Sequence, residues 1–218
     1  MIKNLLDVLV IILLFLIFGI IHSVLASKKI KLKIKSYAGE LMAFYRLGYV
    51  TLSLLSLYLV YLLSPQPLYI VYDLNYPLDF IILIPQFLSL GGIIWALKYF
   101  CIKEFLGINQ ITRWMNDSYD QEELDEQMTL IIEGPYKYVR HPLYFFTILF
   151  LLFRPQMDLF YLTTFVCITT YFLIGSFYEE KKLVEKFGET YLKYQSEVNR
   201  LFPVNIFNPY GSKIIIEK

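Results

Sequence analysis

Long apolar runs separated by short polar stretches dominate this chain. Leu5–Leu25, Phe44–Leu63 and Leu78–Phe100 each approach the roughly 20 residues that an α-helix needs to cross a bilayer. A fourth tract, Leu143–Phe177, is too long for one span and slightly short for two. This pattern predicts a helical membrane protein.

The fourth tract is interrupted by Arg154-Pro155-Gln156. Proline ends helices, and the charged side chain favours water over lipid. We therefore expect a tight helical hairpin with a short first arm and a full-length second arm, Met157–Phe177. Together the runs predict an all-α, polytopic integral membrane protein with about five transmembrane helices and a C-terminal helical hairpin.

Basic residues are distributed unevenly between the predicted loops. The segment Ser64–Pro77 carries none, and the side of the membrane assigned to it holds only Lys3 and Arg154. Loops rich in lysine and arginine stay in the cytoplasm. We therefore expect a multi-pass protein with its N-terminus outside and its C-terminus in the cytoplasm. The compact size favours a prokaryotic plasma membrane, with the endoplasmic reticulum as the alternative. The apolar core of the first helix is longer than that of a signal peptide, which predicts a retained anchor.

The chain is expected to have two functional regions. Residues 1–100 would form a three-helix membrane region, and residues 101–218 would form the cytoplasmic loop, the hairpin and the tail that bind a cofactor. Beyond Phe177 the helix is expected to continue into the cytoplasm until Gly188 stops it. A short amphipathic helix is predicted at Glu189–Val198.

Composition agrees with a membrane protein and argues against nucleic acid or a metal ion as a partner. Hydrophobic residues make up 57% of the chain, and the mean hydropathy is +0.52. A net charge of +1 argues against a nucleic-acid partner, which would be bound by neutralising phosphates. Cys101 and Cys167 offer neither a disulfide framework nor metal-ligand spacing, so we expect no metal.

Two polar clusters lie at the two ends of the last apolar tract. They are Gly134–Tyr144 and Glu179–Lys182. In the expected orientation both lie on the cytoplasmic side, as a shared site requires. Glu179 lies one turn before Leu183 on the same helix face, so we expect its carboxylate to point inward.

The residue types in these clusters suit a zwitterionic nucleoside. The carboxylates of Glu179 and Glu180 could accept hydrogen bonds from a ribose diol, and tyrosine rings attract a cation such as a sulfonium. Arg140 can bind a carboxylate or a phosphate in bidentate fashion, and His141 titrates near neutral pH. Taken singly, these residues also fit a headgroup anchor and ordinary interfacial charges. The specific signal is that both clusters flank one hairpin.

A family resemblance rests on the same stretches. Met128–Tyr144 and Glu179-Glu180, with the following Phe187-Gly188-Glu189, resemble the cofactor segment of the isoprenylcysteine carboxyl methyltransferase family. His22–Ser27 and Phe105–Gln110 resemble the branch that contains methanethiol S-methyltransferases and nitric-oxide-reduction accessory membrane proteins. The resemblance covers most of the chain. It implies an enzyme that transfers a methyl group from S-adenosylmethionine at a cytoplasmic site.

The resemblance also implies which residues bind this cofactor. The implied contacts are Gln121, Thr129, Leu130, Ile131, Tyr136, His141, Pro142, Leu143, Tyr144, Glu179 and Glu180. His141 is in addition a candidate general base for a thiol acceptor, and Arg140 is the second catalytic candidate.

One departure from the family pattern bears on the acceptor. The enzymes that act on prenylated proteins are expected to have an arginine one turn before the first glutamate, where this chain has Gly175. Arg140 is the candidate to replace it. The expected acceptor is a thiol, an isoprenylcysteine-like carboxylate or another small lipophilic molecule that enters from the bilayer. The departure at Gly175 favours the thiol or another small lipophilic molecule over the carboxylate.

An ionisable residue inside a membrane span marks a functional site by default. His22 lies near the cytoplasmic end of the first predicted helix. We expect it to line the acceptor site with Tyr45 and Arg46. An interfacial polar anchor is the alternative for His22.

Two other functions stay open on the sequence alone. Sterol-type membrane reductases look similar in the C-terminal region and would bind NADPH, but their site should show extra basic residues for the 2′-phosphate. A non-catalytic membrane accessory protein would keep the same fold without turnover. Binding of S-adenosylhomocysteine, of NADPH or of neither would separate the three.

Overall fold

The computed structural model describes residues 2–120, 122, 124, 127, 129–203, 210 and 211. The chain is predominantly helical. Within the described residues, four helical stretches are long and apolar enough to cross a membrane: Ile2–Ala26, Lys28–Leu63, Leu78–Leu97 and Leu159–Glu197. The prediction of a helical integral membrane protein is confirmed at this level.

The first arm of the expected hairpin is shorter than a membrane span. It is helix α7, Pro142–Leu152, which has 11 residues. At the rise of an α-helix this corresponds to about 17 Å, roughly half the thickness of the hydrocarbon core. Proline at its first turn suits the start of this helix, because that position needs no backbone N–H donor.

Contacts divide the chain into two compact units. The N-terminal unit is Met1–Gln66 with Cys101–Met128, and the C-terminal unit is Pro67–Phe100 with Thr129–Lys218. Helix α4 therefore belongs to the same unit as the C-terminal segments. The functional division after residue 100 stays a prediction.

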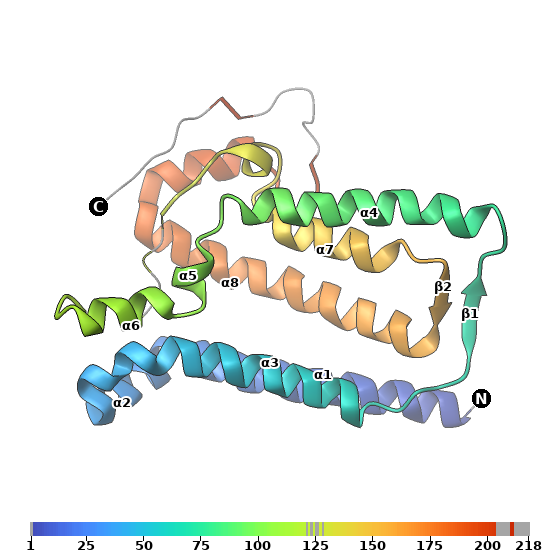
Figure 1. Cartoon of the computed structure of the whole chain (residues 1–218), viewed down its shortest axis with the longest axis horizontal. Helices are drawn as coiled ribbons and strands as arrows, with labels where there is room; N and C mark the ends of the chain where they lie inside the picture. The colour runs from blue at the N-terminus through green and yellow to red at the C-terminus, as the bar shows by residue number, and fades with distance from the viewer. Residues whose placement is uncertain are drawn as a thin grey trace. The chain divides into compact units, whose positions relative to one another are not determined.

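The N-terminal unit is built around two long helices that pack against each other, α1 and α3 (Figure 1). Its elements are α1 (Ile2–Ala26), α2 (Lys28–Ala38), the 3-10 helix η1 (Gly39–Phe44), α3 (Tyr45–Leu63), α5 (Ile102–Phe105) and α6 (Ile108–Met115). Ser27 separates α1 from α2, because its hydroxyl accepts a hydrogen bond from the backbone N–H of Ile30 at 3.4 Å.

A buried carboxylate organises the short helices of this unit. Glu104 is 5% exposed, and both of its oxygens accept hydrogen bonds from Arg113, at 2.8 and 3.1 Å. The side chain of Gln110 and the backbone N–H of Gln127 also donate to it. All these partners lie within 23 residues of Glu104 in the chain, so the cluster is local in sequence.

The start of α6 lies close to the start of α3. Gly107 has a φ of 86°, and a Cβ there would meet the backbone nitrogen of Leu47 and atoms of Arg46. Glycine satisfies both the left-handed backbone and the close approach. Arg46 adds a hydrogen bond from its Nε to the carbonyl oxygen of Phe105 at 2.8 Å, which ties α3 to α5.

The C-terminal unit contains the remaining elements. They are β1 (Ile70–Asp73), α4 (Leu78–Leu97), η2 (Gly134–Lys137), α7 (Pro142–Leu152), β2 (Gln156–Asp158) and α8 (Leu159–Glu197). Helices α4 and α7 run side by side (Figure 1). Gly92 allows this approach, since a Cβ there would collide with the ring of Phe146.

The two strands form an antiparallel ribbon that the sequence analysis did not predict. Ile70 pairs with Asp158 and Tyr72 with Met157, with an irregularity between these two pairs. The expected break at Arg154-Pro155-Gln156 is confirmed, but the chain enters a strand there before α8 begins. The segment from Tyr69 is rich in aromatic and β-branched residues, which favours a strand.

Helix α8 extends far beyond a single span. Asp158 caps its N-terminus by accepting a hydrogen bond from the backbone N–H of Tyr161 at 2.7 Å. Gly188, with a φ of 54°, interrupts the helical backbone. The predicted helix stop at Gly188 and the short helix after it are therefore confirmed, and the last helical turns fold back near residues 140 and 141.

Candidate functional site

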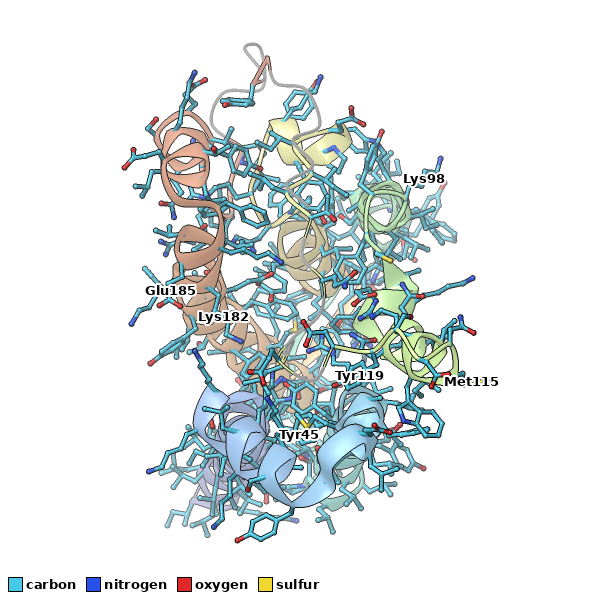
Figure 2. All side chains as sticks on the ribbon, turned by 90° about the vertical axis from the view of Figure 1, so that its left-hand side faces the viewer. Tyr45, Lys98, Met115, Tyr119, Lys182 and Glu185 are labelled. Carbon is cyan, nitrogen blue, oxygen red and sulfur yellow. The ribbon has the colours of Figure 1, made fainter. Side chains whose placement is uncertain are left out.

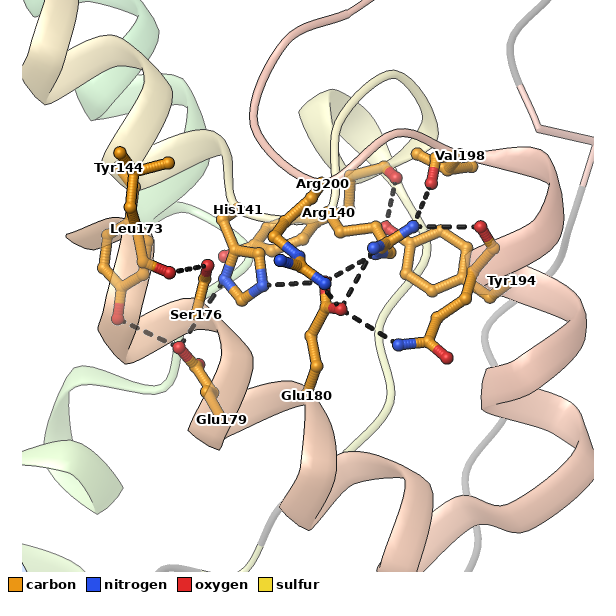
Figure 3. A network of polar contacts seen from close by, with 12 residues as sticks. Arg140, His141, Tyr144, Leu173, Ser176, Glu179, Glu180, Tyr194, Val198 and Arg200 are labelled. Carbon is orange, nitrogen blue, oxygen red and sulfur yellow. Dashed lines mark hydrogen bonds and ion pairs between the residues drawn. The ribbon is translucent and has the colours of Figure 1, made fainter. Parts of the chain in front are cut away.

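The centre of the C-terminal polar network is the carboxylate of Glu180 (Figure 3). It is 2% exposed and accepts hydrogen bonds from Nε and Nη2 of Arg140, at 2.7 and 3.0 Å. Gln195 donates to it at 2.9 Å and Arg200 at 3.2 Å. Nε2 of His141 lies 3.1 Å from Oε1 of Glu180, the oxygen that also accepts the hydrogen bond from Nε of Arg140. We call these five residues the Glu180 cluster.

Arg140 is fully engaged in holding this cluster together. Its Nη1 donates to the carbonyl oxygens of Gln195 and Val198, and its side chain is 8% exposed. The backbone N–H of Arg140 donates to the carbonyl oxygen of Asn199 at 2.9 Å. This geometry favours a structural role for Arg140 over the catalytic role expected from the sequence, and it leaves Arg140 poorly placed to replace the arginine missing at Gly175.

The charge of Glu180 is stabilised by its partners. The expected membrane span ends at Phe177, so Glu180 lies beyond it. Burial by itself raises the pKa of this carboxyl, but hydrogen bonds from His141 and Arg140 and their positive charges outweigh burial and lower the pKa to about 2. Glu180 is therefore ionised at neutral pH, and only 2% of this residue is exposed.

Glu179 has the opposite environment. Its side chain is 45% exposed, it accepts a hydrogen bond from the hydroxyl of Tyr144 at 2.9 Å, and it lies 3.5 Å from Nδ1 of His141. The expectation that Glu179 points inward was wrong: the inward carboxylate is that of Glu180. His141 thus lies between one buried and one exposed carboxylate.

Aromatic rings line up beside Glu179. The rings of His141 and Tyr144 stack with centroids 5.2 Å apart and an angle of 4°. The ring of Phe172 continues the stack at 4.5 Å from Tyr144. The exposed carboxylate of Glu179 can accept hydrogen bonds from hydroxyl groups and attract a cation.

Tyr136 lies near the same network. Its carbonyl oxygen accepts a hydrogen bond from the hydroxyl of Tyr194 at 2.5 Å. Burial, with a smaller effect of the charge of Glu179, raises the pKa of Tyr136 to about 12. Tyr136 is therefore a neutral hydrogen-bonding group at physiological pH.

The other predicted cofactor contacts differ in exposure. Thr129 is exposed and Ile131 is half-buried, whereas Leu130 and Pro142 are buried and Leu143 is half-buried. Gln121 lies outside the described residues. The structure thus brings Tyr136, His141, Tyr144, Glu179 and Glu180 into one network, and the roles of these residues toward a cofactor stay predictions.

Sequence reasoning did not identify Gln195 and Arg200 as members of the Glu180 cluster. They come from the end of α8 and the segment after it, and they reach Glu180 because the chain bends at Gly188. Arg200 also lies with its guanidinium 3.6 Å from the ring centroid of Phe177. The sequence contained one usable signal, the predicted helix stop at Gly188.

The predicted acceptor residues lie in the N-terminal unit. Tyr45 and Arg46 border a pocket whose other lining residues are Lys31, Met42, Tyr49, Gln110, Tyr119 and Leu124. Tyr45 and Tyr119 are labelled in Figure 2. His22 contacts this group through Tyr49, whose hydroxyl lies 2.5 Å from His22 Nε2. Tyr49 was missed, although it follows Tyr45 by one helical turn on the same face.

Within the part of the chain that the structure describes, no group of three or more His, Cys, Asp or Glu side chains is arranged to hold a metal ion.

Comparison with known proteins identifies the family. A methanethiol S-methyltransferase of Crocosphaera subtropica is 31% identical over 192 residues, which cover 86% of this chain and 71% of the relative. The chain belongs to the methanethiol S-methyltransferase family. The resemblance to this branch, inferred from the motifs, is thereby confirmed.

Other relatives carry the same name, and the matches cover a smaller share of their own length. A methanethiol S-methyltransferase of Pseudomonas deceptionensis is 43% identical over 74 residues, 34% of this chain, and the match spans only 28% of that relative. Methanethiol S-methyltransferase 1 of Bradyrhizobium diazoefficiens is 27% identical over 194 residues, 88% of this chain and 65% of the relative. No protein-family model and no solved structure matches the chain.

Proposed function

We propose that this chain is a membrane-bound methyltransferase that uses S-adenosylmethionine to methylate a small thiol. The observation that carries the proposal is the exposed carboxylate of Glu179 beside the stacked rings of His141 and Tyr144. Relatives named methanethiol S-methyltransferase support the same reaction class. The distribution of basic residues favours a cytoplasmic position for the cofactor site.

The donor set fits this cofactor. When bound, S-adenosylmethionine supplies a methyl group on a positively charged sulfonium. Glu179 can accept hydrogen bonds from ribose hydroxyls, and its negative charge can attract the cationic centre. The proposed contacts at Thr129 and Ile131 would be made partly through the backbone.

The Glu180 cluster would serve as the support of this site. It fixes the backbone of Arg140 and His141 against the end of α8 through two hydrogen bonds, to the carbonyl oxygens of Asn199 and Arg200. A fixed His141 in turn fixes the first ring of the stack. Positioning of this kind can supply several kcal/mol, and up to roughly 7–11 kcal/mol, of the barrier to a two-substrate reaction.

Two observations favour a thiol over a prenylated carboxylate as the acceptor. Gly175 provides no cation near the site, and Arg140 is occupied by Glu180 and by two carbonyl oxygens. A carboxylate acceptor bound beside Glu179 would need such a cation there, and relatives named methanethiol S-methyltransferase support a small thiol.

The direct test is ligand-induced stabilisation of the detergent-purified protein. S-adenosylhomocysteine at 100 times its dissociation constant should add about 2.7 kcal/mol to the free energy of unfolding and raise Tm. Glu179→Gln should remove most of this shift while keeping the Tm of the unliganded protein. Glu185→Gln, a change of another exposed glutamate on the same helix, is the matched control and should keep the shift.

Three other results would change the assignment. Stabilisation by NADPH alone would identify a reductase. Stabilisation by neither ligand would favour an accessory protein without catalysis. If Glu179→Gln binds S-adenosylhomocysteine as tightly as the wild type, the site is elsewhere. Formation of dimethyl sulfide from methanethiol and S-adenosylmethionine then establishes turnover and the acceptor.

A further inference from the structure

Three side chains of the N-terminal unit form a continuous chain of hydrogen bonds. The hydroxyl of Tyr49 lies 2.5 Å from Nε2 of His22, and Nδ1 of His22 lies 2.9 Å from the hydroxyl oxygen of Ser53. Tyr49 and Ser53 are one turn apart on α3, whereas His22 comes from α1. A histidine between two hydroxyls inside a membrane helix calls for an explanation, because intramembrane ionisable groups are costly.

The neighbouring bonds decide which nitrogen of His22 carries the proton. The hydroxyl of Ser53 donates its proton to the carbonyl oxygen of Tyr49 at 2.7 Å. Its oxygen is then left to accept a proton from His22, so Nδ1 carries the N–H. Nε2 is therefore the acceptor, and Tyr49 donates its O–H to it. The arrangement leaves His22 ready to take a proton through Tyr49.

Tyr49 also borders the pocket of this unit, together with two cationic residues. Lys31 is only 3% exposed, and the guanidinium carbon of Arg46 lies 5.6 Å from the ring centroid of Tyr49. Gln110 lines the same pocket, and its Oε1 is buried without a hydrogen-bond partner among the described residues. The pocket therefore combines positive charge, a polar acceptor atom and a hydroxyl linked to a proton acceptor.

We propose that this pocket binds the acceptor thiol and that Tyr49 and His22 remove its proton. This inference rests on the proposed function. The thiol S–H gives its proton to the oxygen of Tyr49 as the Tyr49 O–H proton passes to Nε2 of His22. The thiolate that remains uses a sulfur lone pair to form the new S–CH3 bond as the bond between the methyl group and the sulfonium breaks. The positive charges of Lys31 and Arg46 stabilise the thiolate.

Tyr49 is the catalytic residue of this proposal, and His22 acts through it. Among the described residues, the charged groups that line the pocket are Lys31 of α2 and Arg46 of α3, and both favour proton loss from a thiol over its retention. A small alkyl thiol needs such help, since the thiolate is the nucleophile and an ordinary thiol is mostly protonated at neutral pH. An aryl thiol that is already ionised does not need it.

The test compares these two acceptors in the full-length protein. His22→Gln and Tyr49→Phe should each lower kcat/KM for methanethiol by roughly 10²–10⁴-fold, and for an ionised aryl thiol by less than about 10-fold. Tyr58→Phe, which removes an exposed hydroxyl from the same helix, should change neither value. Stabilisation by S-adenosylhomocysteine should be the same in all variants, which shows that they fold.

A second readout needs no methyl donor. A thiolate absorbs ultraviolet light that a protonated thiol does not. Mixing wild-type protein with methanethiol at neutral pH should therefore produce a thiolate signal, and His22→Gln should abolish it.

The outcomes separate the two proposals. If His22→Gln and Tyr49→Phe lose equal activity with both thiols, or keep the thiolate signal, the proton relay is wrong and the methyltransferase assignment stands. If wild-type protein methylates neither thiol, the proposed function fails, and the relay fails with it.

Discussion

The two units of the chain present opposite charges at their open polar sites. In the C-terminal unit the open group is the carboxylate of Glu179 beside stacked rings, an environment that suits a cation. In the N-terminal unit the pocket is bordered by Lys31 and Arg46, an environment that suits an anion. Methyl transfer from a sulfonium to a thiolate needs one site of each kind. Under the two proposals above, the C-terminal unit would bind the cationic donor and the N-terminal unit the acceptor thiol.

Each unit also has a buried carboxylate, and the two carboxylates differ in how far along the chain their partners lie. Glu104 binds partners within 23 residues, whereas Glu180 binds Arg140, which is 40 residues away. Each of these carboxylates accepts two hydrogen bonds from the guanidinium group of one arginine. Such bidentate pairs are among the stronger hydrogen-bonded ion pairs. The distant partners of Glu180 fix the tertiary structure of its unit, and the near partners of Glu104 fix a local turn.

The largest effect on stability should come from neutralising Glu180, the carboxylate whose partners include the distant Arg140. Glu180→Gln leaves two arginines without their buried anion, so it should lower the free energy of unfolding by about 3–5 kcal/mol. Chemical unfolding in detergent measures this value. Glu179→Gln is the adjacent control and should change the stability by less than about 0.5 kcal/mol. Equal losses for the two variants would contradict the assignment of Glu180 as the anchor.

Neutralising Glu104, the carboxylate with partners nearby in the chain, should lower the stability less. Glu104→Gln removes charged hydrogen bonds from Arg113 but keeps the shape of the side chain, so the loss should be about 1.5–3 kcal/mol. The same unfolding experiment applies. A loss as large as that of Glu180→Gln would show that connectivity does not distinguish the two anchors.

Acidification should remove the stability that the ionised carboxylates of Glu180 and Glu104 contribute. The pKa of Glu180 is lowered from 4.5 to about 2, and that of Glu104 is also lowered. A carboxyl with a lowered pKa contributes stability that is complete above its unfolded value and is lost as pH falls through the folded value. The stability difference between wild type and Glu180→Gln should therefore be constant above pH 4.5 and shrink between pH 4.5 and about 2. A difference that grows on acidification would contradict this sign.

The smallest effect should come from an exposed ion pair of the N-terminal unit. Lys35 and Glu122 lie 2.6 Å apart, but the side chain of Glu122 is 84% exposed. Water and salt screen such a pair, so Glu122→Gln should produce no measurable change in unfolding. A clear loss of stability in Glu122→Gln would mean that burial does not explain why Glu180 and Glu104 contribute more than an exposed ion pair.

The sequence by itself determined the helical membrane architecture and the family. Runs of about 20 apolar residues, the break at Arg154-Pro155-Gln156 and the helix stop at Gly188 are local features, and a helix forms or ends according to the residues within a few turns. The pattern also predicts His141, Tyr144 and Glu179 as site residues, because they lie at the ends of one apolar tract, and their role toward a cofactor stays a prediction.

Only the tertiary structure decided which groups meet. Neighbouring residues of a helix point about 100° apart, so the rotation of α8 decided that Glu180 is buried and Glu179 is open. The pairing of Ile70–Asp73 with Gln156–Asp158 and the contact of His22 with Tyr49 join segments that are distant in the chain. Such contacts depend on how helices pack, and a pattern of apolar and polar positions carries no record of them.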